Sequence, residues 1–506
     1  MVDYSGTVER FRKYTDNETF DRIVDDGTLC RMWARCVQAY GSGIAVEFEG
    51  SALTYAQLDE EVAALRSALS EAGCKPGERV GVLCANSVDF IRAFLAAVTA
   101  GCVAVVLPPH LQAEAVMHCS RSFGLRGIIC QDTLTDACLL ARQSIPGLVF
   151  LTPDVKGTSA VPVYDARPED ACVVMFTGGT TGRSKGAMLS HGAVIQGTMN
   201  GCYGVREVFH QRYMLVLPLS HVFGLIRNML ASFYTGSTLY ILKSAQDLFR
   251  EIPKFRPTIL ILVPALAEMA LALSKKLKRN MLGPDLRTII CGAAAVPGYL
   301  IEEYDRMGIN LYPGYGLTES ANLVSGNPEP LRKPNSVGIP YANQELRIVD
   351  GELWLRGRNM LMDYVGTEEA AWTEDHWFRT GDLAYLDEEG YLYITGRIKE
   401  IIVLDNAENI SPAVLEARFN ELPFVQDSQV FEAVNESGKH ILALEVVLRA
   451  TELGTLGSDP NQKAAELLWE VNRRQRPIEQ VSRITIRTTD FKRTPSMKVE
   501  RYKGVQ

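Results

Sequence analysis

The chain has 506 residues, of which 47% are hydrophobic and 22% charged, and its formal net charge at pH 7 is −8. A chain of this length exceeds what one hydrophobic core usually supports, so two or more domains are expected. The acidic balance argues against a nucleic-acid partner, which would require a basic excess or a basic stripe.

Two further features suggest where the protein works. The N-terminus is polar and mixed in charge, without the apolar core of a signal peptide, and the most apolar stretch, residues 93–107, is interrupted by Gly101. That stretch is shorter than the ~20 residues of a membrane span. The eleven cysteines include no Cys-x-x-Cys pair, which favours small buried side chains over metal ligands or disulfides. We therefore expect a cytoplasmic protein without an integral membrane segment.

Helical and strand patterns alternate from about Leu53. Residues 55–72 place apolar side chains at three- and four-residue spacing, which predicts an amphipathic helix, and residues 88–99 predict a second helix. Short apolar runs predict strands over residues 79–83, 103–107, 214–217, 238–241, 259–263 and 288–291. Strand, helix and strand at this pitch indicate parallel sheets covered by helices, an α/β fold.

The pattern changes after Glu345. Apolar and polar residues alternate in period two between glycine turns, which indicates antiparallel strands and a β-rich subdomain. A compact segment with its own strand and helix patterns follows Arg397. We expect a large N-terminal domain over residues 1–396, a hinge over 397–400 and a small α+β domain over 401–506.

One loop carries the features of a phosphate site. An apolar strand at residues 173–175 leads into Phe176 to Gly186, FTGGTTGRSKG. Glycines allow close backbone approach, so successive N–H groups can converge on an anion. Hydroxyl and ammonium groups add donors. The residues expected to hold a polyphosphate are Thr177, Gly178, Gly179, Thr180, Thr181 and Lys185.

A loop of this composition also has two other interpretations, a P-loop and a solvated hinge. The P-loop of kinases requires Gly-Lys followed by Ser or Thr. Here Gly186 follows Lys185, so that pattern is excluded. A solvated hinge loop stays open for this segment taken alone.

Three later motifs argue against a mere hinge loop. They are Tyr315 to Glu319 (YGLTE), Thr380 to Asp382 (TGD) and Gly396-Arg397. Together with the loop, and in this order, they resemble the ANL superfamily of acyl-CoA synthetases, peptide-synthetase adenylation domains and luciferases. The chain is most similar to the AMP-forming acyl-CoA synthetases. The resemblance implies an adenylate-forming domain followed by a small mobile lid.

The resemblance also implies a nucleotide site. Tyr315 would stack on adenine, Glu319 would bind Mg²⁺ as a hard carboxylate, and Asp382 would accept hydrogen bonds from the ribose hydroxyls with Arg397 as its partner. The segment after residue 291 would lie beside adenine, although a strand end packed in the core explains its small residues equally well. The remaining implied nucleotide residues are Gly292, Ala293, Ala294, Gly316, Thr318 and Ile394.

The C-terminal segment supplies the implied catalytic cation. Lys498 resembles the family lysine that bridges the substrate carboxylate and the α-phosphate, and a solvated basic tail is the alternative. Lys399 takes the hinge position. Asn406 and Ala407 would lie on the coenzyme A path, with Ala407 where the family usually has glycine.

The acyl pocket is implied by Pro218 to Gly224, PLSHVFG. His221 would lie near the substrate carboxylate, and Phe223, Gly292, Gly314 and Leu323 would line the cavity. No charged side chain occurs in these stretches to pair with an amino group or a second carboxylate. An apolar pocket favours a fatty or aryl acid over an amino acid.

The predicted reaction is ATP-dependent. A carboxylic acid would become an acyl-adenylate with release of pyrophosphate, and the acyl group would then pass to coenzyme A, with ATP and Mg²⁺ as cofactors. One alternative is a stand-alone enzyme that loads the phosphopantetheine of an acyl carrier protein. Another is a catalytically silent nucleotide-binding protein, which the joint presence of Glu319, Asp382, Arg397 and Lys498 argues against.

Overall fold

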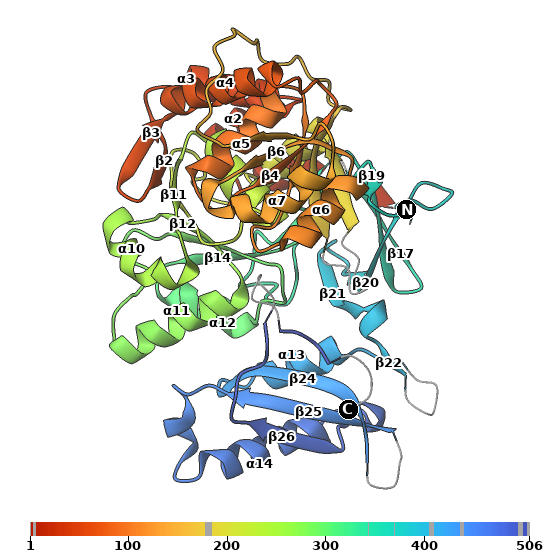
Figure 1. Ribbon diagram of the computed structural model, residues 1–506. Helices are drawn as coiled ribbons and strands as arrows, with labels where there is room; N and C mark the ends of the chain where they lie inside the picture. Colours follow the sequence, from red (N-terminus) through yellow and green to blue (C-terminus); the bar gives the residue numbers. More distant parts are fainter. Residues whose placement is uncertain are drawn as a thin grey trace.

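The computed structural model describes residues 2–3, 7–177, 185–342, 344–368, 370–403, 409–435, 440–493 and 499–502. Figure 1 shows a large part that contains most of the chain and, below it in blue, a smaller part formed by the C-terminal segment. The large part contains three sheets, and the smaller part has a sheet and a hydrophobic core of its own.

A nine-stranded sheet forms the centre of the large part, in the order β16-β15-β14-β13-β12-β10-β11-β2-β3. Neighbouring strands from β2 to β14 are parallel. The strands are β2 (Ile44–Phe48), β3 (Ser51–Thr54), β10 (Arg212–Leu215), β11 (Thr238–Ile241), β12 (Ile259–Leu262), β13 (Thr288–Cys291), β14 (Asn310–Tyr315), β15 (Ser325–Gly326) and β16 (Ile339–Pro340).

A seven-stranded sheet lies beside it, in the order β19-β9-β8-β5-β4-β6-β7. The run from β7 to β8 is parallel, whereas β8, β9 and β19 pair antiparallel. The strands are β4 (Arg79–Leu83), β5 (Val103–Val106), β6 (Leu125–Cys130), β7 (Val149–Leu151), β8 (Ala171–Thr177), β9 (Lys185–Ser190) and β19 (Asp363–Val365).

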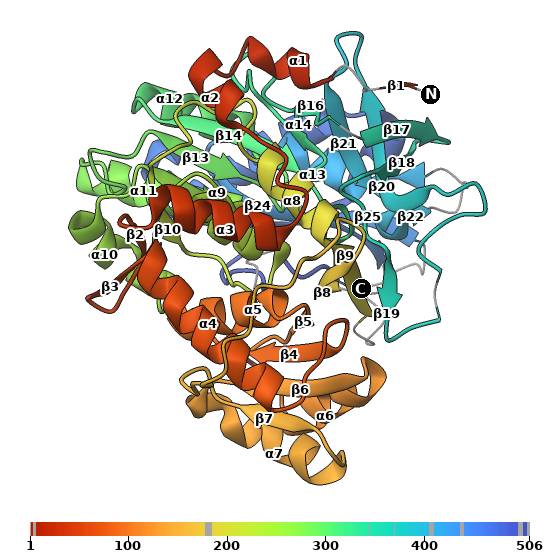
Figure 2. The same cartoon turned by 90° about the horizontal axis from the view of Figure 1, so that it is seen from above.

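Helices cover these sheets, and α6 and α7 lie at the outer side of the seven-stranded one (Figure 2). The chain between Val88 and Thr99 is apolar on nearly all sides and is accordingly buried. The helices are α1 (Thr7–Arg12), α2 (Asn17–Arg22), α3 (Leu29–Tyr40), α4 (Tyr55–Glu71), α5 (Val88–Thr99), α6 (Ala113–Ser122), α7 (Thr135–Ser144), α8 (His191–Asn200), α9 (Ala231–Tyr234), α10 (Leu248–Phe255), α11 (Pro264–Leu277) and α12 (Gly298–Arg306).

The predicted elements agree closely with this architecture. The helices expected over residues 55–72 and 88–99 are α4 and α5, and a capping box between Thr54 and Gln57 explains where α4 begins. The strand expected over residues 214–217 is displaced, because β10 spans Arg212–Leu215. Val216 and Leu217 are buried outside the strand, so their apolar character reflects burial only. The α/β fold class is confirmed.

The antiparallel texture after Glu345 is also confirmed. A five-stranded sheet in the order β1-β17-β18-β20-β21 has antiparallel neighbours throughout its described ladder. Its strands are β1 (Val2–Asp3), β17 (Gln344–Val349), β18 (Glu352–Gly357), β20 (Phe378–Leu386) and β21 (Leu392–Arg397).

The C-terminal part packs two helices on a three-stranded sheet. It contacts the large part through Arg449, whose guanidinium lies 3.5 Å from the Glu268 carboxylate, to which the Tyr299 hydroxyl donates a hydrogen bond. Its elements, with the preceding turn η5, are η5 (Ile398–Glu400), β22 (Ile402–Val403), β23 (Asn409–Ile410), α13 (Pro412–Asn420), β24 (Val425–Val434), β25 (His440–Leu448), α14 (Pro460–Arg473) and β26 (Arg483–Arg487).

Two of the general expectations concern the whole chain. All eleven cysteines are buried and free of disulfides. Among the helices of the described residues, none combines the length and the apolar character needed to cross a membrane.

Candidate active site

The ends of the predicted phosphate loop are held by a β-hairpin. Thr177 is the last residue of β8, Lys185 is the first of β9, and the two pair directly across the antiparallel ladder. Both strands lie beside the short 3₁₀ turn η4 (Thr318–Ser320), which carries Glu319. The loop therefore starts and ends next to the glutamate implied as the Mg²⁺ ligand. Gly178, Gly179, Thr180 and Thr181 lie outside the described residues.

A tyrosine links the two charged residues of this corner. The Tyr364 hydroxyl donates a hydrogen bond of 2.8 Å to Oε1 of Glu319, and the Lys185 ammonium lies 3.7 Å from the centre of the Tyr364 ring. A cation over an aromatic face and a phenol against a carboxylate are both favourable contacts. Tyr364 thus orients Glu319 and holds Lys185 nearby.

Tyr364 was not among the predicted site residues. It lies on β19, which pairs antiparallel with β9 and so brings residue 364 opposite Ala187. This strand is separated from the loop by a long stretch of sequence, and only the pairing of the strands brings them together. Its short Asp-Tyr-Val run carries no pattern that would indicate a site.

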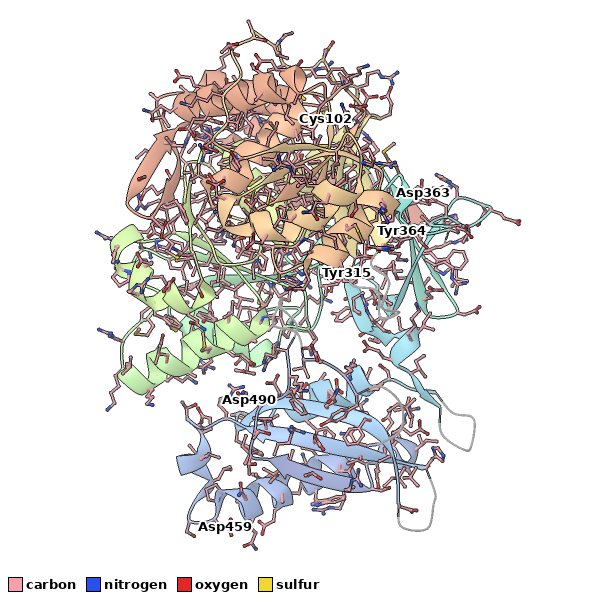
Figure 3. All side chains as sticks on the ribbon, viewed as in Figure 1. Cys102, Tyr315, Asp363, Tyr364, Asp459 and Asp490 are labelled. Atoms are coloured by element: carbon pink, nitrogen blue, oxygen red, sulfur yellow. The ribbon has the colours of Figure 1, made fainter. Side chains whose placement is uncertain are left out.

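Residues 315–319 run from the end of β14 into η4, and Gly316 packs closely on the backbone of residue 322. A Cβ atom on Gly316 would lie 1.3 Å from the Asn322 carbonyl oxygen, so this position accepts only glycine. Tyr315 and Glu319 lie at the two ends of this short segment, and Thr318 begins η4. Tyr315 lies at the edge of the large part that faces the C-terminal part (Figure 3).

The aspartate of the predicted ribose site contacts two other predicted site residues. Asp382 is 2% exposed, accepts a hydrogen bond from the Tyr315 hydroxyl at 2.5 Å, and forms an ion pair of 2.7 Å with Arg397. Burial raises the pKa of Tyr315 well above its usual value, so the phenol stays protonated and donates. The structure therefore brings these three predicted residues together.

Local geometry explains how Asp382 is aimed inward. Gly381 adopts a left-handed φ of 71°, and the Thr380 hydroxyl accepts the Asp382 N–H at 3.0 Å. Across the ladder, Asp382 pairs with Arg397 at the end of β21. The Thr-Gly-Asp motif thus forms an irregularity within β20, where the register with β18 shifts, and its left-handed middle residue favours glycine.

The other predicted nucleotide and hinge residues have the following places. Gly292 is buried directly after β13, Ala293 and Ala294 are exposed beyond it, and Ala293 has a left-handed φ of 68°. Ile394 is half-buried on β21, and Lys399 is exposed on η5. Lys498, Asn406 and Ala407 lie outside the described residues, so their roles stay predictions.

Four of the predicted acyl residues lie in contact with one another, at the place where the resemblance implies the acyl slot. A Cβ atom on Gly292 would lie 3.0 Å from the Gly314 carbonyl oxygen and 3.6 Å from the Phe223 ring, so these residues are in mutual contact. Leu323 is 5% exposed and lies beside Gly314. His221 immediately precedes the π-helical segment η2 (Phe223–Leu230), and its carbonyl accepts the Leu225 N–H at 2.9 Å.

The residues present fit a Mg²⁺ ion that is shared with phosphate. Glu319 offers a hard carboxylate already oriented by Tyr364. Within the described ranges, no group of three or more His, Cys, Asp or Glu side chains could hold a metal ion. One oriented carboxylate suits a cation whose other ligands are phosphate oxygens and water.

Comparison with known proteins agrees with this geometry. Residues 33–365 match the protein family described as AMP-binding enzyme. The chain is 31% identical over 405 residues to a feruloyl-CoA synthase of Amycolatopsis sp, covering 76% of this chain and 81% of the relative. It is 30% identical over 441 residues to an indoleacetate–CoA ligase of Aromatoleum aromaticum, covering 81% and 86%.

Solved structures show the same fold. An anthranilate CoA ligase, AuaEII, in complex with anthranoyl-AMP superposes with a TM-score of 0.82 at 20% identity, covering 93% of this chain and 95% of that one. ATP-bound MatB from Rhodopseudomonas palustris superposes with a TM-score of 0.80 at 22% identity, covering 93% and 97%.

Family, fold and site point to one class of enzyme. The glycine-threonine loop ends, the YGLTE segment and the Asp382–Arg397 pair occupy neighbouring elements of an adenylate-forming fold. The chain therefore belongs to the AMP-binding enzymes of the ANL superfamily, as an AMP-forming acid–thiol ligase that activates a carboxylic acid with ATP and passes it to coenzyme A.

Proposed function

We propose that this ligase activates an aryl acid, with the nucleotide held by Tyr315, Asp382 and Arg397 and the acid held in the slot between Phe223 and Gly292. The backbones of Gly292 and Gly314 and the ring of Phe223 meet at that slot. Backbone and an aromatic face suit a planar ring better than a flexible chain. The relatives named for ferulate and indoleacetate activate ring-bearing acids, which supports this choice.

The observation that carries the proposal is the meeting of distant segments. Residues from β9, η4, β14, β19, β20 and β21 meet through the Lys185–Tyr364–Glu319 and Tyr315–Asp382–Arg397 contacts. One set carries the charges that phosphates and Mg²⁺ require, and the other carries the acceptor that a ribose requires. The two sets together supply contacts for the phosphates, the metal ion and the ribose of one ATP molecule.

In the first half-reaction a carboxylate oxygen of the acid attacks the α-phosphorus. A new oxygen–phosphorus bond forms, the bond to the bridging oxygen of the β-phosphate breaks, and pyrophosphate leaves. The attacking carboxylate is ionised at pH 7, so no general base is needed. Positioning and charge stabilisation carry the catalysis, with Lys185 assigned to the outer phosphates and Lys498 to the carboxylate and the α-phosphate. A Mg²⁺ ion bound at Glu319 would neutralise phosphate charge.

In the second half-reaction the thiol of coenzyme A attacks the carbonyl carbon, and AMP leaves. We assign the change between the two steps to a rotation of residues 401–506 about Lys399 in η5. Residues on both sides of η5 belong to different hydrophobic cores, which supports a hinge there. The Arg449–Glu268 contact between the two parts would break in that rotation. Asn406 and Ala407 are assigned to the coenzyme A path.

The proposal is tested by measuring pyrophosphate release over a panel of aryl, fatty and amino acids, with and without free coenzyme A. We expect turnover with aryl acids that rises when coenzyme A is added. Turnover confined to fatty acids would contradict the substrate class. An adenylate released only by a carrier protein would favour that acceptor, which the coenzyme A ligase relatives do not.

A further inference from the structure

One buried cation has no part in the chemistry described so far. Arg227 lies on η2 and is 2% exposed. Within the described ranges, its Nη1 atom has no hydrogen-bond partner and its guanidinium has no ion pair with a carboxylate. Burying an unpaired charge costs several kcal/mol (on the order of the desolvation penalty of one ion). The Tyr213 side chain forms a hydrogen bond with the guanidinium, but the Nη1 atom still lacks an acceptor among the described residues.

Residues next to Arg227 and to its contact Gly201 in the sequence also have unpartnered polar atoms. The stem of Arg227 packs on Gly201, where a Cβ atom would lie 3.0 Å from the arginine Cδ. Asn200, which precedes Gly201, is fully buried, and neither its Oδ1 nor its Nδ2 has a partner among the described residues. The Oδ1 atom of Asn228, which follows Arg227, also has no described partner. Because nearly all buried polar groups in proteins are hydrogen-bonded, these atoms indicate that a bound group completes their hydrogen bonds.

Two buried tyrosines locate the guanidinium over the sheet. Burial raises the pKa of Tyr213 and of Tyr341 to about 12, and the nearby positive charge of Arg227 opposes the rise in both. Tyr213 lies on β10 and Tyr341 directly follows β16, with β12, β13, β14 and β15 between those strands. The charge of Arg227 thus acts on tyrosines from both ends of the run of strands from β10 to β16. In the middle of that run, β13 leads into Gly292 and β14 carries Gly314.

Tyr341 connects the surroundings of Arg227 to the acyl slot. A Cβ atom on Gly326 would lie 2.1 Å from the Tyr341 hydroxyl, and Gly326 pairs directly with Gly314 across the β14–β15 ladder. On η2, Phe223 and Arg227 are four residues apart, which places them on about the same side of a helix. Phe223 contacts Gly292 at the slot. Arg227 therefore lies farther along the face of η2 that looks into the slot.

We propose that Arg227, with Tyr341 and Asn200, forms the closed end of the acyl pocket and selects acids that carry a second carboxylate at their far end. This inference rests on the proposed function. A guanidinium presents parallel N–H donors that match the two oxygens of a carboxylate, and no carboxylate of the described chain occupies them. The apolar slot would bind the body of the acid, and the ATP-facing carboxylate would react.

The test compares matched acids within each variant. Wild type and Arg227→Met receive 4-carboxycinnamate with 4-methylcinnamate, 4-carboxybenzoate with 4-methylbenzoate, and nonanedioate with nonanoate, and pyrophosphate release gives kcat/KM for each. We expect wild type to favour one dicarboxylic acid over its methyl partner by at least about 10-fold, and Arg227→Met to lose that preference. The ratio does not depend on how much of a variant folds.

Controls separate this inference from the proposed function. Arg206→Met removes an exposed arginine near Tyr312 and should leave the ratio unchanged. Arg227→Lys keeps the charge without the paired donors and should keep only part of the preference. An equal ratio in wild type and Arg227→Met would overturn the inference and indicate water around the guanidinium, with the ligase activity intact. Absence of pyrophosphate release with every acid would overturn the proposed function itself.

Discussion

The nucleotide region and the closed end of the acyl pocket differ in whether their charged side chains already have partners in the chain. At the nucleotide region, Asp382 is already paired with Tyr315 and Arg397, and Glu319 with Tyr364. At the other end, Arg227 is buried without a carboxylate within the described ranges. The first region is preorganised by its own side chains, whereas the second is completed only by a bound group.

The largest effect is expected where the two regions meet, at the reacting carboxylate. Lys498→Ala should lower acyl-adenylate formation by about 1,000-fold, because the charge that develops on the α-phosphate loses its cation. Thioester formation from synthetic acyl-adenylate should stay close to wild type. Rapid-quench measurement of each half-reaction checks this, and equal loss in both would contradict the division of labour.

The second-largest effect is expected when a charge is removed from the preorganised nucleotide region. Asp382→Asn removes the charge that Arg397 pairs with and weakens the acceptor of the Tyr315 hydroxyl. Breaking a buried pair by removing one partner costs about 3 kcal/mol or more, so ATP affinity should fall about 100-fold. Isothermal titration with ATP measures it. Asp387→Asn, which removes an aspartate paired with Lys333, is the matched control and should keep wild-type affinity.

A smaller effect would sharpen the role of the tyrosine between the two charges. Tyr364→Phe keeps the ring beneath Lys185 and removes the hydrogen bond to Glu319. Since hydrogen bonds to charged groups are worth about 1.5 kcal/mol, Mn²⁺ binding in the presence of ATP should weaken about 10-fold, as read by electron paramagnetic resonance. Tyr385→Phe, at an exposed tyrosine, is the control. Unchanged Mn²⁺ affinity in Tyr364→Phe would leave the hydroxyl a structural role only.

The smallest effect is expected at Glu329, a paired carboxylate outside both regions. Arg332, assisted by the hydroxyls of Tyr14 and Tyr391, lowers the pKa of Glu329 to about 2. A lowered pKa stabilises the fold above the usual value of 4.5, and this contribution fades as the pH falls toward 2. Glu329→Gln should therefore lower the urea midpoint slightly at pH 7 and less at pH 3.5. A larger difference at pH 3.5 would contradict this.

Part of this site could be predicted because its residues are close in sequence. Tyr315 and Glu319 belong to one segment, and Asp382 lies in a Thr-Gly-Asp irregularity of β20 that its own glycine permits. Local motifs of this kind carry their geometry with them. The helix from Tyr55 and the strand from Arg79 were predicted for the same reason, since their apolar spacing is local.

Tyr364 and Arg227 could not be predicted in that way. Tyr364 reaches Glu319 through the pairing of β19 with β9, and nothing near it in the sequence indicates that pairing. Arg227 lies shortly after the predicted acyl motif, but its lack of a carboxylate partner depends on every element packed around it. Both are properties of long-range packing.

From the sequence alone came the α/β class, because short-range patterns encode strands and helices. The adenylate-forming chemistry and the residues of the YGLTE and TGD motifs came from the resemblance of those motifs to the ANL superfamily. The tertiary structure alone decided which of these side chains meet, that a tyrosine from a separate strand joins Lys185 to Glu319, and that a guanidinium is enclosed without its counter-charge. The reason is physical: a contact between distant segments depends on how sheets pair and pack, and burial is a property of the whole fold.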